Sequence, residues 1–453
     1  MFDAVFNRFI EQSPIPVMLN SILERTLSPE KIDSCFELSA DKQYTKGLLF
    51  SSLFEVMGLV VFKVFPAINA AYKQKKGNLG VSITSVYNKL NGLELGISQH
   101  LVRSTGAEHA DIITALKGEK EPLISGYRIK MLEGNCIEAT EHRLEVLRET
   151  SAGPLPGKSL VVYDPVTELA IDVFPCEDGH SQERSLLKQI VPTVEEQDVW
   201  VMDRNFCVRS FILSIKGQKG FFVVRQHAQL PYTELTAQKK VGQTETGDVY
   251  EHWIEVTDEK GKAHKLRRIV IKLNKATRDK DKELYIITNL PKKDADALLV
   301  SEVYRKRWNI ETMFQELESY LHSEINTLGY PKAALFGFCV ALVAYNTLSV
   351  LKAALRSQYG EELVTNELSA YYIAGNITRT YDGMMIAIPT IQWDIVRNMS
   401  LKVFCVFLLE LTDKVDLEKY RKSKRGPKKP RPKRDKYKGS PHVSTARLLN
   451  AKK

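Results

Sequence analysis

The sequence predicts a mixed α/β protein, with a helical region before the sheet and another after it. Three observations support this class. Residues 1–125 have apolar residues at helical spacing. From Tyr127 onward, short apolar runs alternate with turn residues, as in strands. The order from there is three strands, helix, strand, helix and strand, which is typical of a mixed sheet, and acidic residues stand at the ends of several strands.

The pattern changes several times along the chain, and each change marks a predicted boundary. A small β-rich insertion separates two parts of the sheet domain. The predicted regions are a helical N-terminal DNA-binding domain (1–125), the first part of a catalytic core (126–230), the insertion (231–292), the second part of the core (293–355), a helical region (356–418) and a basic tail (419–453).

The N-terminal region contains clear helix signals. Ser28 followed by Pro29 is typical of a helix start. An apolar helix is expected over 48–65, ending before Pro66. After a turn at 77–80, Ser82 is expected to cap a second helix over 83–90. A helix, a glycine turn and a short polar helix fit a helix-turn-helix, and they fit an ordinary helical bundle equally well.

The strands are expected where β-favouring runs meet turn residues, and a helix is expected over 185–191. Those of the core are 128–133, 159–164, 170–174, 199–203 and 221–225, and those of the insertion are 248–256, 265–272 and 283–288.

Charge is concentrated near the C-terminus. Of the net +9, residues 419–438 contribute 12 basic residues against one acid, a local +11, so the remainder is about −2. This basic segment predicts a polyanionic partner, and its Pro and Lys content predicts that it is disordered or lies along that partner. Six cysteines without paired spacing disfavour zinc sites and disulfides and fit a reducing cytoplasm.

Residues 333–351 contain no charge and are nearly long enough to span a membrane. They also contain Asn346, Thr347 and Ser349, and they follow a strongly charged helix. We therefore expect a buried core helix, no membrane partner and no secretory peptide.

The segment 304–318 lacks Gly and Pro and is expected to be one continuous helix. Its apolar stripe (Val303, Ile310, Met313, Phe314, Leu317 and Leu321) predicts a core-facing side, and Trp308 is also expected in the core. Tyr304, Arg307 and Glu311 fall on an adjoining strip.

Three carboxylates occupy suitable positions for a shared site. Glu133 and Asp203 end predicted strands, and Glu311 lies on the later helix. Such a cluster is costly unless cations compensate it. Two Mg²⁺ ions, with Mn²⁺ as a substitute, would do so and would suit in-line phosphoryl transfer. The alternative from spacing alone is three separate salt bridges.

The sequence resembles the DDE transposases of bacterial insertion sequences, in the family with a Tyr-x2-Arg-x3-Glu-x6-Lys signature. Tyr304, Arg307 and Glu311 match it in type and spacing, and 200–206 resembles the family's second-Asp strand. Blocks at 132–135, 141–144, 177–180 and 183–184 also resemble the family. The resemblance covers roughly 127–351. It implies a ribonuclease-H-like fold, catalysis and metal binding by Glu133, Asp203 and Glu311, and cut-and-paste DNA movement by a homodimer on double-stranded DNA.

Two positions depart from this family pattern. Glu133 stands where the family has Asp, which is compatible with a tolerated ligand or with an attenuated or inactivated enzyme, and Asp164 is a fallback ligand. Glu318 stands where the signature has Lys. Lys306 or the tail is a candidate to replace that cation.

The resemblance and the basic residues together predict a set of DNA contacts. Tyr304 offers a stacking surface, Arg307 suits a phosphate, and the tail should bind phosphates without reading sequence. The predicted DNA-binding residues are Tyr304, Arg307, Lys306, Arg204, Lys424, Arg425, Lys428, Lys429 and Arg431. An inactive DNA-binding relic and a general nuclease are the alternative functions.

Overall fold

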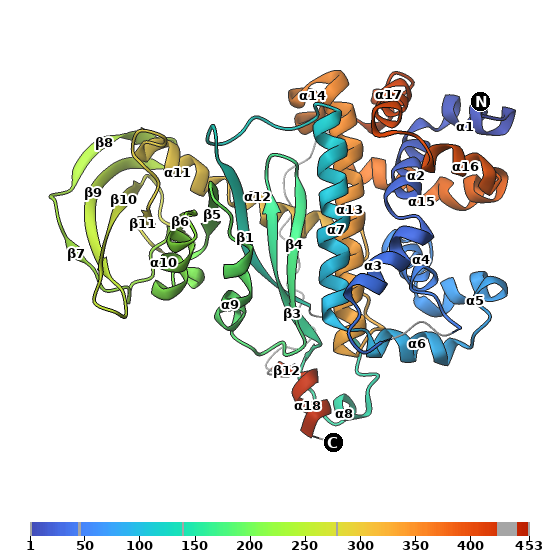
Figure 1. Ribbon diagram of the computed structural model, residues 1–453, viewed down its shortest axis with the longest axis horizontal. Coiled ribbons are helices and arrows are strands. Elements are labelled where there is room, and N and C mark those ends of the chain that lie inside the picture. The colour runs from blue at the N-terminus through green and yellow to red at the C-terminus, as the bar shows by residue number, and fades with distance from the viewer. Residues whose placement is uncertain (1, 44–46, 138–139, 278–279, 424–441, 452–453) are drawn as a thin grey trace.

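The protein is described by a computed structural model that covers residues 2–43, 47–137, 140–277, 280–423 and 442–451. The helices that precede the sheet are α1 (Ala4–Gln12), α2 (Pro14–Thr26), α3 (Pro29–Ser39), α4 (Phe50–Val61), α5 (Ile68–Leu79), α6 (Ile83–Gly92) and α7 (Leu95–Ala115). Ser28 and Ser82 cap α3 and α6 as expected. The helices α1 to α6 lie on the opposite side of α7 and α13 from the sheet (Figure 1).

A single mixed sheet forms the centre of the chain. Its strands are β1 (Arg128–Ile137), β3 (Gly157–Asp164), β4 (Leu169–Cys176), β5 (Asp198–Met202), β6 (Phe221–Arg225), β7 (Thr233–Glu234), β8 (Lys239–Thr244), β9 (Gly247–Thr257), β10 (Ala263–Leu273) and β11 (Glu283–Thr288). The short elements between them are α8 (Glu145–Arg148), β2 (Pro154–Leu155), η1 (Glu183–Leu186), α9 (Leu187–Ile190), η2 (Val191–Thr193), η3 (Arg204–Phe206) and α10 (Arg209–Gly217).

The strand order is β4-β3-β1-β5-β6-β11-β10-β9-β7, with β8 paired to β9. β1 pairs antiparallel with β3 and parallel with β5, and β5 pairs parallel with β6. An antiparallel β4-β3-β1 half followed by parallel β5 and β6 is the ribonuclease-H-like arrangement that the resemblance implied. The predicted mixed α/β class is therefore confirmed.

The β-rich insertion continues this sheet. β11 pairs antiparallel with the last core strand, β6, and β10 and β9 extend the same ladder. The insertion therefore shares the backbone hydrogen bonding of the core instead of forming a separate sheet. Figure 1 shows it curving away from the N-terminal helices at the far end of the molecule.

The helices after the sheet return the chain to the N-terminal side. They are α11 (Ala297–Arg305), α12 (Trp308–Tyr320), α13 (Pro331–Tyr359), α14 (Glu361–Asn366), α15 (Ala370–Ala387), α16 (Thr390–Arg397) and α17 (Leu401–Thr412), followed by η4 (Leu417–Tyr420), β12 (Val443–Ser444) and α18 (Thr445–Ala451). α7 and α13 contact each other and β4, covering one sheet face, while α9 and α10 pack on the other (Figure 1).

α13 is the helix whose length and hydropathy would suit a membrane span, and its apolar window is wholly buried inside the protein. Its polar residues explain how it pairs with the sheet. Asn346 donates to the Ala170 carbonyl and accepts from the Ala170 amide, both at 2.8 Å. Ser349 donates to the Glu168 carbonyl. These bonds satisfy the backbone groups of Ala170 in the edge strand β4 and the carbonyl of Glu168 just before it, so a buried core helix is the structural result.

The segments on both sides of 424–441 are docked on the protein, which corrects the expectation of a tail without packed structure over 419–453. On the near side, Tyr420 is buried. On the far side, β12 pairs with β2. Asp178 accepts bonds from Ser444 Oγ at 2.7 Å and Arg447 Nε at 2.8 Å. The composition argument failed here because Val443 and Ala446, unlike the prolines and lysines before them, can pair and pack.

Buried His109 on α7 makes the stability of this helical region pH-dependent. Its Nε2 lies 3.2 Å from Thr26 Oγ1, and burial lowers its pKa to about 3. Below pH 6.5 the unfolded chain takes up a proton that folded His109 does not, so stability falls as pH falls. We predict that His109→Gln reduces the slope of the unfolding free energy against pH, by up to about 1.4 kcal/mol per pH unit between pH 6 and 4. Urea unfolding at several pH values measures this slope, and equal slopes in the natural and His109→Gln proteins would contradict the prediction.

Candidate active site

The strand register brings two of the predicted acids together. Leu132 of β1 pairs with Met202 of β5, and these strands are parallel. Glu133 and Asp203 are the next residues, so they lie side by side where the strands reach the same sheet edge. Leu132 and Met202 face the α10 side of the sheet. Because side chains alternate along a strand, Glu133 and Asp203 both face the α12 side.

The helix that carries Glu311 is interrupted, which corrects the prediction of one continuous helix over 304–318. α11 ends at Arg305 and α12 begins at Trp308. At the joint, the Arg307 amide bonds to the Tyr304 carbonyl, three residues back. The sequence gives no Gly or Pro signal for this break. The apolar stripe is nevertheless confirmed, with Val303, Ile310, Met313, Leu317 and Leu321 buried and Phe314 partly buried.

The break places Arg307 between the acids. One terminal nitrogen of its guanidinium pairs with Glu133 Oε2, and the other donates to Glu311 Oε1 at 2.9 Å. The Arg307 side chain is only 8% exposed, so its guanidinium is largely shielded from water and is paired with the carboxylates. Glu133 and Glu311 therefore meet through Arg307, and Asp203 stands beside them.

The electrostatics of Glu133 reflect this crowding. Burial raises the pKa of Glu133 to about 7, Arg307 opposes the shift, and the nearby charges of Asp203 and Glu311 add to it. A carboxyl with such a raised pKa is one whose charge is incompletely compensated. The site thus favours additional positive charge.

Tyr304 and Trp308 have the opposite exposure to that expected from the sequence, since Tyr304 is buried and Trp308 is exposed. Tyr304 is 9% exposed, and burial raises its pKa to about 12. Trp308 is 60% exposed, which corrects its assignment to the core. The physical reason for the exposure of Trp308 is helical spacing, because it stands two residues before Ile310 in α12 and so lies on the side away from the buried stripe. The guanidinium of Arg307 lies 5.7 Å from the Trp308 ring centroid.

Arg225, at the end of β6, is a site residue that sequence reasoning missed. Val223 pairs with Val201 in the parallel β5–β6 ladder, so Arg225 stands level with Asp203 and on the same face. Its charge acts on buried Tyr304, and it pairs with Asp281 at 2.6 Å. The available signal was its position at a strand end, the same signal that identified the acids.

Glu183 supports the site from the opposite face. It accepts a bond from Asn205 Nδ2, and a Cβ built on Gly134 would lie 2.1 Å from its Oε1. Glycine beside Glu133 therefore leaves space for Glu183, which ties the loop after Asp203 to β1. This gives the family-like Gly134 and Glu183 positions a structural role.

Asp164 is excluded as a substitute for Glu133. It ends β3, but β3 runs antiparallel to β1, with Tyr163 opposite Met131. Asp164 therefore lies level with Lys130, roughly 10 Å along the strand from Glu133. Acids at strand ends converge only when the strands are parallel.

The other predicted contacts divide into two groups, one described by the structure and one outside it. Lys306 and Arg204 are exposed. Glu318 stands where the signature has Lys, and a lysine from another part of the chain lies close to it. Lys63 Nζ donates to the carbonyl of the next residue, Ser319, at 2.9 Å. Lys63 follows α4, so the helical region supplies a cation here. The predicted tail contacts Lys424, Arg425, Lys428, Lys429 and Arg431 lie outside the described residues.

The donor chemistry fits a divalent cation of the kind that the resemblance implies. Carboxylate oxygens are preferred by Mg²⁺ and Mn²⁺, and Glu133 lacks full compensation. Over the residues that the structure describes, no three or more His, Cys, Asp or Glu side chains are gathered tightly enough to hold a metal. Arg307 is the cation that joins Glu133 to Glu311 in this arrangement.

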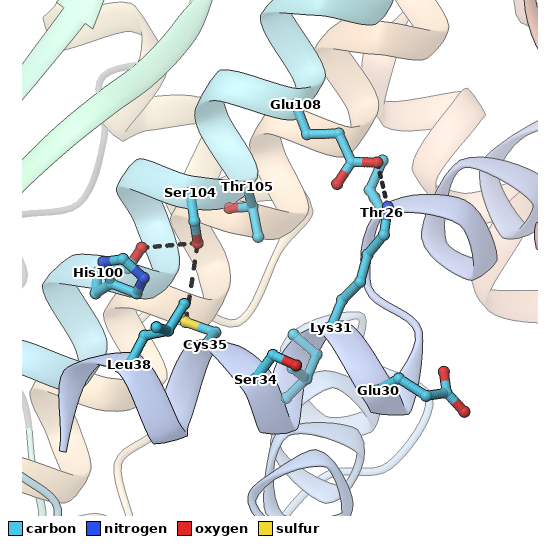
Figure 2. A pocket seen from close by; sticks show the side chains of 11 residues that line it. Thr26, Glu30, Lys31, Ser34, Cys35, Leu38, His100, Ser104, Thr105 and Glu108 are labelled. Atoms are coloured by element: carbon cyan, nitrogen blue, oxygen red, sulfur yellow. Dashed lines mark hydrogen bonds and ion pairs between the residues drawn. The ribbon is translucent and has the colours of Figure 1, made fainter. Parts of the chain in front are cut away.

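A separate cavity of about 370 Å³ lies between α3 and α7. Figure 2 shows Lys31 of α3 reaching Glu108 of α7, with Cys35 and Ser104 deeper in the helix pair. The cavity contains none of the predicted site residues.

Comparison with known proteins gives a family match and a structural neighbour. Residues 157–347 match a family model described as the transposase DDE domain, a range that includes Asp203, Arg307 and Glu311 but begins after Glu133. A piggyBac transposase synaptic complex with hairpin DNA aligns over 89% of this chain and 86% of its own, at 10% identity and a TM-score of 0.38. No curated protein matches the chain.

The exposure of Trp308 predicts that it contributes little to stability. Trp308→Ala should change the unfolding free energy by no more than about 0.5 kcal/mol, as for other surface positions. Trp200, which is 1% exposed in β5, is the matched control, and its change to Ala should cost about 3–5 kcal/mol. Urea unfolding compares the two, and similar losses would place Trp308 in the core after all.

Proposed function

We propose that this chain is a DDE transposase, since residues 157–347 match the transposase DDE domain, and that it binds the terminal inverted repeats of an insertion sequence and cuts and rejoins DNA there. One observation carries the proposal. Glu133 and Asp203 are level on adjacent parallel strands, and Arg307 joins Glu133 to Glu311. Three acids distant in the chain thus share one site.

The proposed chemistry is metal-dependent phosphoryl transfer. Two Mg²⁺ ions, or Mn²⁺, would activate the attacking oxygen and stabilise the leaving oxygen. Glu133, Asp203 and Glu311 would hold the ions. The sheet fixes two of these carboxylates through backbone pairing, while α12 positions the third through its buried stripe.

The DNA contacts follow from exposure. We propose that Trp308 takes the stacking role first expected of Tyr304, because Trp308 is the exposed aromatic beside Arg307. Buried Tyr304 then orients Arg307 and Arg225. Lys306 and Arg204 stand at the surface near the acids, where phosphates would pass. Two element ends require two active sites, so a homodimer on the DNA, in the bacterial cytoplasm, completes the proposal.

Cleavage assays on the DNA that flanks the gene test the acids. Asp203→Asn and Glu311→Gln should each lower Mg²⁺-dependent cleavage by more than about 100-fold, since loss of even an outer ligand partner costs up to that much. Asp164→Asn is the matched control and should leave cleavage unchanged. Equal losses in all three variants would contradict the assignment. Cutting without the element ends would instead favour a general nuclease.

Glu133 predicts attenuation of this activity. The extra methylene shifts the carboxylate by about 1 Å, a misplacement that can cost about 100-fold. Glu133→Asp should therefore cleave faster than the natural protein, by up to about 100-fold, in single-turnover assays with Mg²⁺ and with Mn²⁺. If neither protein cleaves DNA while both bind the element ends, the protein is an inactive DNA-binding relic of a transposase.

The basic tail should contribute salt-dependent binding. Replacing Lys428, Lys429 and Arg431 with Gln removes three phosphate contacts in this proposal. The slope of log affinity against log salt should then fall in magnitude by about 2.7. Fluorescence anisotropy with a labelled duplex measures the slope, and an unchanged slope would exclude these contacts.

A further inference from the structure

The cation that joins two of the predicted metal ligands is part of the protein itself. Arg307 contacts Glu133 with one arm of its guanidinium and Glu311 with the other, at 2.9 Å for Glu311. A guanidinium most often binds one carboxylate with both arms. Here each arm takes a different carboxylate, so Arg307 acts as a bridge between a strand and a helix.

The position of Arg307 is set by the helix break. It immediately precedes α12, and Glu311 follows one turn later. The Arg307 side chain is 8% exposed, against 29% for Glu311 and 18% for Glu133. The bridge is therefore more deeply covered than the carboxylates it joins, and water screens it weakly.

A divalent ion and this bridge compete for the same oxygens. Glu133 Oε2 and Glu311 Oε1 already accept from Arg307, and two cations at these oxygens would repel each other at short range. A metal ion that binds through Glu133 Oε2 and Glu311 Oε1 therefore requires Arg307 to leave these oxygens. A DNA phosphate suits the guanidinium fork as well as a carboxylate does. The exposed ring of Trp308 lies 5.7 Å from this guanidinium.

We propose that Arg307 is a resident counter-ion that holds the acids together before DNA arrives, and that it gates metal loading by exchanging Glu133 and Glu311 for a DNA phosphate. Metal binding and DNA binding then favour each other through one residue, because linkage between two ligands is reciprocal. The inference rests on the proposed function, since it assumes that these acids hold metal. It adds that Arg307 keeps metal ions out of the active site when no DNA is bound.

Mn²⁺ binding to the full chain without DNA tests the gate. Free Mn²⁺ is measured by electron paramagnetic resonance during titration. Arg307→Gln should bind Mn²⁺ at least about tenfold more tightly than the natural protein, since a competing charge has gone. The matched control is Arg305→Gln, which removes the same charge from an exposed residue that pairs with Glu302, and should leave Mn²⁺ affinity unchanged. Equal affinity in the natural and Arg307→Gln proteins would overturn the proposal.

A second variant protects the test against misfolding. Arg307→Lys keeps the charge, but a single ammonium cannot make the two-armed bridge. It should bind Mn²⁺ about threefold or more tightly than the natural protein, and an unchanged affinity would overturn the gate. Adding Asp203→Asn to Arg307→Gln should remove the gain, and a gain that persists would place the ion elsewhere and also overturn the gate.

The gate and the proposed function fail in different ways. Tighter Mn²⁺ binding without cleavage of the flanking DNA would support the gate and reject the transposase activity. Cleavage with equal Mn²⁺ affinity in the natural and Arg307→Gln proteins would do the reverse.

Discussion

Repulsion among carboxylates is the constraint on which the site depends. Glu133, Asp203 and Glu311 gather negative charge at one sheet edge, and Glu133 responds with a pKa of about 7 because burial leaves it poorly compensated. The protein stabilises the cluster with Arg307, drawn from the same helical segment that contributes Glu311. An arrangement that needs a cation to exist is also one that can accept a different cation. This connects the stability of the edge to its proposed chemistry.

The fold supplies this edge through two kinds of rigidity. Backbone pairing between β1 and β5 fixes the level of Glu133 and Asp203 relative to each other. The insertion strengthens that frame, because β11, β10 and β9 extend the sheet beyond β6 and so cover what would otherwise be an open edge. On the other side, α13 satisfies the edge of β4 through Asn346. The sheet is thus supported at both sides of the acids.

The helical region is connected to the site as well as packed behind it. Lys63, after α4, donates to the end of α12 at Ser319, close to Glu318. The His322 amide also bonds to the Val61 carbonyl. Lys63, from a distant segment, therefore brings a cation close to Glu318, the position at which the signature has Lys. At the other end of the chain, Asp178 accepts bonds from Ser444 and Arg447, so these C-terminal residues are attached to the folded protein.

The sequence by itself predicted most of the strands and a buried helix over 333–351, within the observed 331–359, because alternation and apolar run length are local properties. It also named the candidate acids from family-like spacing. Only the tertiary structure decided which acids meet. Glu133 and Asp164 both end strands, and the direction of β3 alone separates them. The break before Trp308 likewise lacks a local signal, since it arises where packing of α11 and α12 overrides helix propensity. Position within the sheet, which no short stretch encodes, assigned Arg225 to the site, and only the folded structure showed that Arg307 contacts both Glu133 and Glu311.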